Sequence, residues 1–348
     1  MIRLGFIGYG YWGPHLLGKF LKSDKFDVRI VAEASPERLA LAQRALPDIR
    51  ACRSSDEIIQ NREIDAIAIA TPVRTHYPLA RAALMAGKHV LVEKPLAHNV
   101  EAGKELVEIA ERLGLTLMVD HVLLFTGAVQ TLRELKVRGE LGTISYIDSM
   151  RVNLGLFQPD VNVLWDLAPH DLSVIDHLLE EEPVHVEATG YAHVNPQLPD
   201  IAYVTMFFPS QVVAHLNLSW MSPVKVRRFA IGGSRKMVVW DDLNVEERIK
   251  IYNSGISFQP DESKEIVMPF YRIGDIFSPR VKGHDALEGI VDHFAEVIAG
   301  KTHSITSGEH GLRMLRILET AQNRLDAGMV RSQASTPAVA ATRGVAAR

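Results

Sequence analysis

Cysteine is nearly absent from this sequence of 348 residues. Cys52 is the only one, so the chain can form neither an internal disulfide nor a thiolate metal cluster, and we expect it to be a small buried residue. The N-terminus enters a predicted strand at once and lacks the features of a signal peptide. No apolar run approaches the roughly eighteen residues of a membrane span. We therefore expect a cytoplasmic protein.

An excess of one charge is missing too, since 38 lysines and arginines stand against 42 aspartates and glutamates, for a formal net charge of -4. The cations are spread along the chain rather than massed in blocks. This distribution gives no electrostatic footprint for nucleic acid or for an anionic membrane. We expect small molecules and further copies of the chain as partners.

The length and the hydrophobic share of 47% favour two domains. From residue 2 to about 121, short apolar runs alternate with stretches of helical period. This alternation predicts repeated βαβ units around a parallel sheet. The expected strands are 2–8, 28–33, 66–71, 90–93 and 115–119, and Gly114 should end a helix that begins near Val100.

After residue 121 the pattern changes to longer alternating segments, at 143–153, 184–192, 201–208, 212–220 and 229–240. Turn-like pairs such as Pro209-Ser210 and Gly232-Gly233 join several of them, which favours hairpins in a mostly antiparallel sheet. Helical spacing predicts helices over 285–299 and from about 309 to 325. A broad sheet needs its outer face covered, so pairing of two copies through this sheet is a further hypothesis.

The predicted fold is therefore α/β in two parts. Residues 1–121 form a Rossmann domain, and residues 122–330 form an α+β domain with a large, mostly antiparallel open sheet. The last helices could pack back on the first domain, and residues 331–348 form a tail of small and polar residues.

The strongest local signal is Gly8-Tyr9-Gly10-Tyr11-Trp12-Gly13, which directly follows an apolar strand and opens a helix. The first glycine permits a tight turn, the second lets backbone approach a pyrophosphate, and the third lets helix and strand pack closely. Free N–H groups at the helix start can then hold phosphates. This context predicts dinucleotide binding, with a purely structural glycine turn as the alternative.

Glu33 lies twenty residues after the last glycine, at the end of the second expected strand. A carboxylate there can accept hydrogen bonds from the ribose hydroxyls and repel a 2'-phosphate by about 1 to 4 kcal/mol, so NAD is favoured over NADP. Arg38, in the next helix, could instead partner a phosphate or neutralise Glu33. A solvated strand end is the plain alternative for Glu33.

Three further segments carry a resemblance to a known family. They are Ala70-Thr71-Pro72 followed by His76, then the run from Ala86 to Pro95 that contains Glu93-Lys94-Pro95, and Trp165-Asp166-Leu167-Ala168-Pro169-His170-Asp171. Together with the glycine motif they resemble the glucose-fructose oxidoreductase, inositol dehydrogenase and rhizopine-catabolism family, written Gfo/Idh/MocA. The resemblance implies a Rossmann domain that binds NAD(P), and we expect a homodimer or homotetramer.

The resemblance also implies catalytic roles for Lys94, Asp166 and His170. The ammonium of Lys94 would stabilise a developing alkoxide, His170 would take the hydroxyl proton, and Asp166 would orient the imidazole or the substrate. Three alternatives stay open: Asp166 as a helix N-cap, His170 as a packing histidine, and the pair as metal ligands. No third ligand is marked in the sequence, so we expect no metal.

Two further residues, Arg151 and Asn153, resemble substrate-cleft residues of the branch that acts on nucleotide-linked sugars. An exposed strand face would explain them equally well. His121, at the domain boundary, could flank the nicotinamide or cap a strand. The residues expected at the dinucleotide are Gly8, Gly10, Tyr11, Trp12, Gly13, Glu33, Arg38, Thr71, Pro72, His76, Glu93 and Lys94.

The sequence thus predicts an NAD-dependent oxidoreductase that transfers a hydride between nicotinamide and a secondary hydroxyl or keto carbon of a sugar or nucleotide-sugar. Two alternatives are a ketosugar reductase that uses NADPH and a non-catalytic NAD(P)-binding regulatory protein on the same scaffold.

Overall fold

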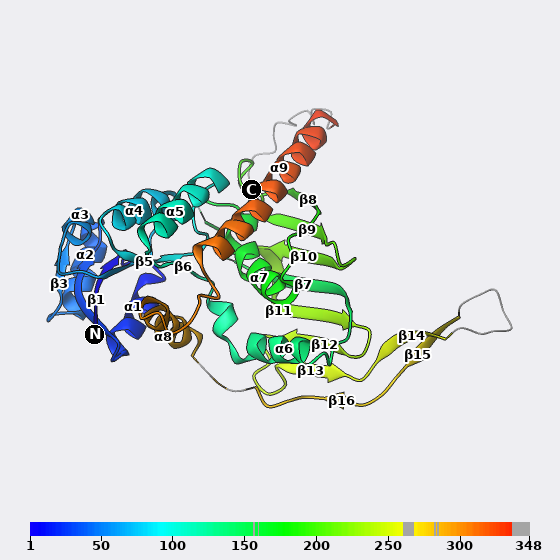
Figure 1. Cartoon of the computed structure of the whole chain (residues 1–348). Coiled ribbons are helices and arrows are strands. Elements are labelled where there is room, and N and C mark those ends of the chain that lie inside the picture. Colours follow the sequence, from blue (N-terminus) through cyan, green and yellow to red (C-terminus); the bar gives the residue numbers. More distant parts are fainter. Residues whose placement is uncertain (156, 159, 260–267, 282, 284, 336–348) are drawn as a thin grey trace, which may run out of the picture.

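Two sheets organise the chain, as Figure 1 shows for the computed structural model. The structure describes residues 1–155, 157–158, 160–259, 268–281, 283 and 285–335, and every structural statement below refers to these residues. None of their helices is long and apolar enough to cross a membrane.

The first sheet is parallel and contains β1 (Ile2–Ile7), β2 (Phe26–Ala32), β3 (Arg50–Cys52), β4 (Ala66–Ile69), β5 (His89–Glu93) and β6 (Leu117–Asp120). Its spatial order is β3-β2-β1-β4-β5-β6, so the order reverses between β1 and β4. Such a reversal leaves a crevice at the carboxyl ends of the strands, where ligands bind in this class of fold. All four residues of β4 are fully buried, as expected for a strand covered on both faces.

Five helices connect these strands: α1 (Gly13–Lys22), α2 (Pro36–Ala45), α3 (Asp56–Ile59), α4 (Val73–Met85) and α5 (Val100–Leu113). Local chemistry sets their ends. The side chain of Asn99 caps α5 by accepting from Ala102 N at 2.8 Å, and Gly114 ends this helix in the left-handed conformation at φ 63°. The predicted role of Gly114 is confirmed.

The second sheet has eight strands in the order β16-β13-β12-β11-β7-β10-β9-β8. They are β7 (Ile144–Leu154), β8 (His185–Tyr191), β9 (Ile201–Phe207), β10 (Val213–Ser219), β11 (Met221–Gly233), β12 (Met237–Asp241), β13 (Ile249–Tyr252) and β16 (Ile276–Phe277). Neighbouring strands are antiparallel except for the parallel pair β7 and β10. The predicted fold class, a Rossmann sheet followed by a mostly antiparallel open sheet, is confirmed.

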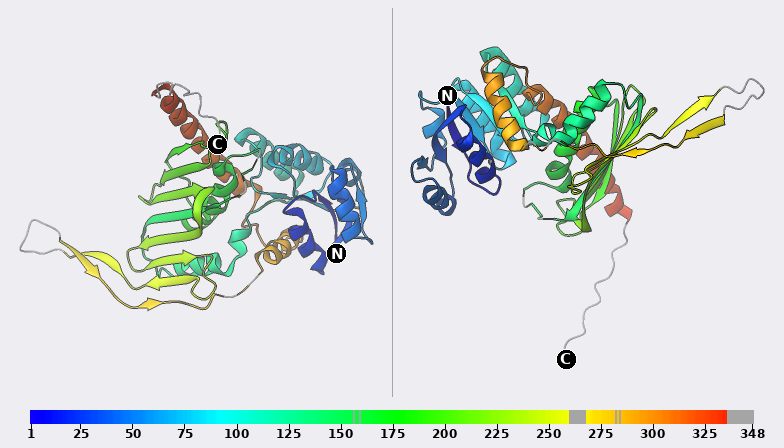
Figure 2. Two further views of the ribbon diagram at one scale, coloured as in Figure 1. Left: turned by 180° about the vertical axis from the view of Figure 1, so that it is seen from behind. Right: turned by 90° about the horizontal axis from the view of Figure 1, so that it is seen from below.

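Helices cover one face of the second sheet. They are α6 (Gly127–Val137), α7 (Val163–Leu179) and α9 (Gly308–Ser335), with the short 3-10 helix η1 (Val122–Phe125) leading into α6. Figure 2 shows the opposite face, which none of the described helices covers. Tyr146, Met150, Tyr203 and Phe207 lie on strands of this sheet and are each exposed by 37–41%.

The last two helices lie against the first sheet's layer of helices. In α8 (Ala286–Ile298), Phe294 is fully buried and its ring stacks on Phe26 with centroids 5.9 Å apart. Lys19 of α1 donates to Glu288 at 3.0 Å and also pairs with Asp285. Helix α9 packs along α5 before it crosses to the second sheet, so this one helix contacts both domains.

Several elements differ from those that the sequence predicts. The three-residue strand β3 is too short to produce a recognisable pattern, and β11 begins at Met221, eight residues before the predicted strand. Helix α9 continues through Ser335, beyond the predicted end near residue 325, because alanine, arginine and glutamine favour helix there. Residues 331–335, assigned to the tail, are therefore helical, and the rest of the tail lies outside the described residues.

A hairpin of β14 (Gly255–Gln259) and β15 (Met268–Arg272) forms a separate two-stranded sheet that projects from the body in Figures 1 and 2. The sequence pattern predicts no element in this region. Tyr271 on β15 and Ile273 just after it are exposed by 69% and 89%.

Replacing Phe294 by alanine should lower the free energy of unfolding by about 3 to 5 kcal/mol, because it leaves a cavity where the ring joins α8 to the first domain. Urea denaturation of the purified protein measures this change. The control is Met85→Ala, at a side chain that is 54% exposed on α4. Equal stability of the two variants would contradict the packing described for α8.

Candidate active site

The glycine turn after β1 has the geometry that its sequence predicts. Gly8 adopts φ +104°, and a Cβ atom there would lie 2.3 Å from the carbonyl oxygen of Ala70. A Cβ at Gly13 would lie 2.4 Å from the carbonyl oxygen of Gly8, so both glycines are required for packing. At Gly10 the only atom within 4 Å is a guanidinium nitrogen of Arg38, at 3.4 Å. The second glycine therefore leaves open space for a ligand to approach the backbone.

Glu33 ties this turn to the end of β2. Its side chain is buried, Oε2 accepts from Tyr9 N at 2.6 Å, and Oε1 accepts from Ser35 N at 2.8 Å. Each carboxylate oxygen has a second lone pair, so Glu33 can still accept from a ribose hydroxyl. The plain alternative of a solvated strand end does not hold for this buried carboxylate.

A cavity of about 320 Å³ opens at the carboxyl ends of β1, β2 and β4. It brings together six of the residues predicted at the dinucleotide and adds Arg53, Ser55 and Thr75, which the sequence did not mark. The predicted residues in its lining are Gly8, Gly10, Glu33, Arg38, Thr71 and Pro72. The open space at Gly10 and the acceptor at Glu33 fit the diphosphate and a ribose of a dinucleotide.

Other predicted dinucleotide residues have different surroundings. Tyr11 and Trp12 are exposed by 84% and 39% at the start of α1. His76 is buried, with Nδ1 2.8 Å from the Pro95 carbonyl oxygen and Nε2 2.7 Å from that of Thr71. His76 therefore holds the loops after β4 and β5 together and positions their residues.

Lys94 lies just after β5 and reaches the second domain. Its Nζ donates to the main-chain oxygen of Asp166 at 2.7 Å and lies 3.3 Å from Asp166 Oδ1. The other carboxylate oxygen of Asp166 accepts from Trp220 Nε1 at 3.2 Å. Two residues predicted from separate motifs, 72 positions apart, are thus in direct contact.

Helix α7 presents Asp166 at its first turn. The cap is Asn162, whose side chain accepts from Trp165 N at 3.2 Å, so Asp166 is not the N-cap. Pro169 lies inside the helix, where it lacks an N–H and its ring disturbs the preceding turn. The Asp166 carbonyl lies in that turn and accepts from Lys94.

One turn after Asp166, His170 is half-buried, and its Nδ1 is buried without a hydrogen-bond partner among the described residues. Burial lowers the pKa of His170 well below its ordinary value, and the positive charge of Lys94 lowers it further. The imidazole is therefore neutral at pH 7 and able to accept a proton.

Glu93 and Asp120 form a buried carboxyl pair behind Lys94, because β5 and β6 place them opposite each other in register. Burial and the neighbouring Asp120 raise the pKa of Glu93 well above its ordinary value. Burial likewise raises the pKa of Asp120 to about 6. The raised pKa of Glu93 favours its protonated, neutral form beside Asp120, so Glu93 does not present a free charge.

Arg151 and Asn153 lie on the covered side of β7. Arg151 is buried, and its Nε donates to Asp171 Oδ1 at 2.7 Å, while Ser149 Oγ donates to Asp171 Oδ2 at 2.7 Å. The guanidinium is therefore already engaged within the protein. Asn153 is half-buried, and its side-chain amide lies beside Gly155, which also borders the Trp220 ring.

Sequence reasoning missed Trp220 and Asp120, and it quoted Asp171 within the third motif without giving it a role. Trp220 follows β10 and Asp120 ends β6, and neither has a distinctive local pattern around it. Among the described residues no group of three His, Cys, Asp or Glu side chains could hold a metal ion. His121 is buried beside His310, with ring centroids 4.9 Å apart, and caps no strand through its side chain.

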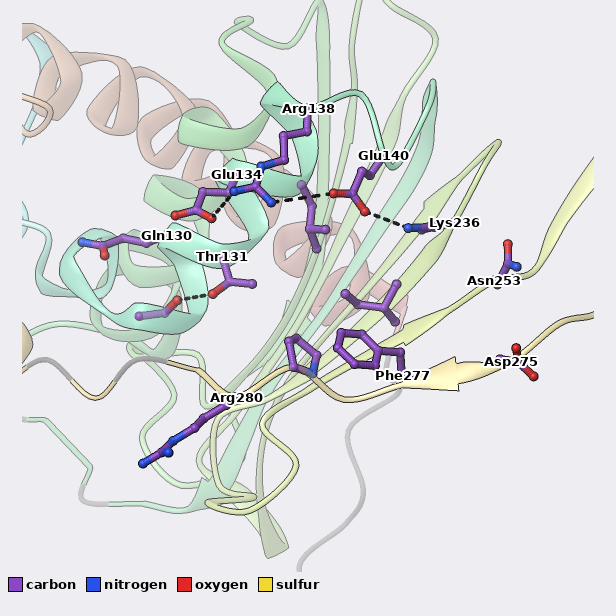
Figure 3. Close-up of a pocket in the computed structure, with 14 residues that line it drawn as sticks. Gln130, Thr131, Glu134, Arg138, Glu140, Lys236, Asn253, Asp275, Phe277 and Arg280 are labelled. Atoms are coloured by element: carbon purple, nitrogen blue, oxygen red, sulfur yellow. Dashed lines mark hydrogen bonds and ion pairs between the residues drawn. The ribbon is translucent and has the colours of Figure 1, made fainter.

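A larger cavity of about 450 Å³ lies between α6 and the strands β13 and β16 (Figure 3). Its charged residues largely pair with one another: Glu140 accepts from Lys236 at 2.7 Å, and Glu134 accepts from Arg138 at 3.3 Å. It contains none of the predicted site residues. We therefore place the candidate active site at the dinucleotide crevice.

Comparison with known proteins identifies the family of the chain. Residues 2–121 match the family model described as the oxidoreductase family with an NAD-binding Rossmann fold, and residues 129–239 match the GFO/IDH/MocA C-terminal domain. The chain belongs to the Gfo/Idh/MocA oxidoreductase family. The resemblance predicted from the four motifs is confirmed.

Individual relatives cover most of the chain. A UDP-N-acetylglucosamine 3-dehydrogenase of Acidithiobacillus ferrooxidans is 29% identical over 326 residues, 90% of this chain and 94% of its own. An uncharacterised oxidoreductase of Escherichia coli is 30% identical, covering 72% and 74% of the two chains. A solved structure of the Acidithiobacillus enzyme superposes with a TM-score of 0.78 at 28% identity, over 94% of this chain and 99% of that one. The chain is an NAD(P)-binding oxidoreductase that acts on CH–OH groups.

Replacing Gly10 by alanine should preserve stability and weaken dinucleotide binding by about tenfold or more, since the added methyl group fills the ligand space without meeting backbone. Gly8→Ala should instead lower stability, because it combines positive φ with a backbone clash. Thermal melting and calorimetric titration with NAD separate the two effects. If Gly10→Ala bound NAD with wild-type affinity, the dinucleotide would not bind at this turn.

Proposed function

We propose that the protein is an NAD-dependent dehydrogenase that oxidises a secondary ring hydroxyl of a nucleotide-linked sugar. The observation that carries this proposal is the contact of Lys94 with Asp166, which holds the first turns of α7, and with them His170, against the carboxyl end of the Rossmann sheet. In this proposal the ammonium of Lys94, the carboxylate of Asp166 and the neutral imidazole of His170 act together where the two domains meet.

Each of the three side chains has a role in this reaction. When bound, the nicotinamide supplies the acceptor for the hydride that leaves the substrate carbon. His170 accepts the hydroxyl proton, for which its neutral form is required. Lys94 stabilises the negative charge that develops on the oxygen, and Asp166 holds Lys94 in place. Trp220 fixes the Asp166 carboxylate through its indole N–H.

The substrate class is supported by two observations. The Acidithiobacillus relative, which matches this chain over nearly its whole length, is named for a 3-dehydrogenase of UDP-N-acetylglucosamine. Asn153 also lies next to the corner formed by Gly155, Trp220 and Asp166, where an amide can bind sugar hydroxyls. Arg151, by contrast, is engaged with Asp171 and supports the site from within.

Lys94→Ala and His170→Ala should each reduce kcat for UDP-sugar oxidation by about 100-fold or more and change NAD affinity little, because the groups act on the reacting hydroxyl. NADH absorbance and calorimetric titration with NAD measure the two quantities. Because burial lowers the pKa of His170, kcat/KM of the wild type should stay level on acidification to about pH 6.5 and fall only below it.

His303→Asn is the matched control, since this histidine is exposed and distant in sequence from the site. It should retain wild-type turnover. Wild-type turnover in either Lys94→Ala or His170→Ala would refute the assigned roles. Absence of turnover with every UDP-sugar and free sugar in the wild type, despite NAD binding, would favour a regulatory protein on this scaffold.

The preference for NAD is supported by Glu33, whose buried carboxylate borders the cavity. Glu33→Gln should lower the ratio of kcat/KM with NAD to that with NADP by about tenfold, because it removes the charge that repels a 2'-phosphate and keeps an acceptor for Tyr9 N. Glu37→Gln, at an exposed carboxylate outside the cavity lining, is the control. A wild type that prefers NADP would assign Arg38 and Arg53 to phosphate binding instead.

The assembly and location are further parts of the proposal. The uncovered face of the second sheet carries Tyr146, Met150, Tyr203 and Phe207, and a second copy of the chain could cover it. We keep the homodimer or homotetramer, the cytoplasmic location and the domain boundary at residue 121 as predictions.

A further inference from the structure

Arg227 on β11 lies beside the active-site helix, on the same side of the sheet as Arg151. The two arginines are directly paired in the register of β11 and β7. The register between residues 226 and 232 is regular, and Phe229 and Ile231, two and four residues after Arg227, are buried on the covered side. Alternation along the strand therefore directs Arg227 toward the side on which α7 lies.

The two neighbouring guanidinium groups differ in what neutralises them. Arg151 is bound by the buried carboxylate of Asp171. Arg227 makes one ion pair among the described residues, with Asp242 Oδ2 at 3.8 Å from its NH1, which is longer than a hydrogen bond. Burial lowers the pKa of Arg227, and the charge of Arg151 adds to this effect. An arginine remains charged in a protein, so this cation is only weakly compensated.

The position of Arg227 connects it to the reacting groups. Asp171, which binds the paired Arg151, directly follows His170 on α7. The charges of Lys94, Arg151 and Arg227 all lower the pKa of His170. Lys94 has Asp166 and Arg151 has Asp171 as close counter-ions, so Arg227 is the cation of the three whose partner is distant.

We propose that Arg227 binds a phosphate of the nucleoside diphosphate on the substrate while the sugar ring lies at Lys94 and His170. The proposal rests on the proposed function and names the residue that selects a nucleotide-linked sugar over a free sugar. A guanidinium can donate two parallel hydrogen bonds to a phosphate, which fixes orientation as well as charge.

Phosphate binding there would also affect the proton acceptor. A negative charge beside Arg227 opposes the cations that lower the pKa of His170, so the imidazole becomes a stronger base when the substrate is bound. Nucleotide binding and proton transfer would therefore be coupled through one electrostatic field.

The test compares Arg227→Gln with Arg228→Gln in the full-length protein saturated with NAD. Arg228 is the next residue and is exposed, and strand alternation places it on the opposite side of the sheet. Calorimetric titration with UDP should show at least about tenfold weaker binding for Arg227→Gln and wild-type binding for Arg228→Gln. Titration with uridine, which has no phosphate, should show the same affinity in all three proteins.

Steady-state kinetics give a second readout. With a UDP-sugar, Arg227→Gln should raise KM by at least about tenfold with a smaller change in kcat, as expected for a group remote from the reacting carbon. Arg227→Lys keeps the charge and loses the paired donors, so its UDP affinity should fall between those of wild type and Arg227→Gln. This variant also serves if Arg227→Gln fails to fold, as judged by thermal melting.

The outcomes separate this inference from the proposed function. Equal UDP affinity in wild type and Arg227→Gln overturns the phosphate assignment and leaves the roles of Lys94 and His170 intact. Loss of glucuronate binding instead of UDP binding would assign Arg227 to a carboxylate and overturn the proposal. Wild-type turnover in His170→Ala would overturn the proposed reaction whatever Arg227 binds.

Discussion

The hydrogen bonds from Lys94 Nζ to Asp166 are the interaction on which the site depends. Lys94 comes from the end of the Rossmann sheet, whereas Asp166 comes from the helix that covers the second sheet. Their contact joins the Rossmann domain to the helix that carries Asp166 and His170. Trp220, just after β10, and the Asn162 cap hold the second partner in place, so several elements of the second domain converge on one ammonium group.

Charge compensation around this contact gives each group its chemical state. The raised pKa of Glu93 beside Asp120 keeps these adjacent strand ends from carrying two full negative charges. Burial next to Lys94 keeps His170 neutral and able to accept a proton. The carboxylate of Asp171 neutralises the charge of Arg151. Arg227 is therefore the cation with the weakest local partner.

Local patterns were sufficient to predict those features of the candidate site that lie within one short segment. The glycine turn, Glu33 and the Lys94 motif each depend on a strand end and the few residues that follow it, so their chemistry is visible in sequence order. The role of Arg151 was harder to predict. Its partner Asp171 is 20 positions away and its neighbour Arg227 is 76 positions away, and no local pattern reports which guanidinium is already bound.

The sequence by itself determined the βαβ order and the glycine turn, and it marked Lys94, Asp166 and His170 as candidates, because strand periodicity, glycine spacing and short motifs are local properties. The tertiary structure decided that Asn162 caps α7, that His76 ties two loops instead of facing a ligand, and that Trp220 fixes Asp166. These contacts join residues from different elements. They exist because burial forces each polar group to find a partner in space, wherever that partner lies along the chain.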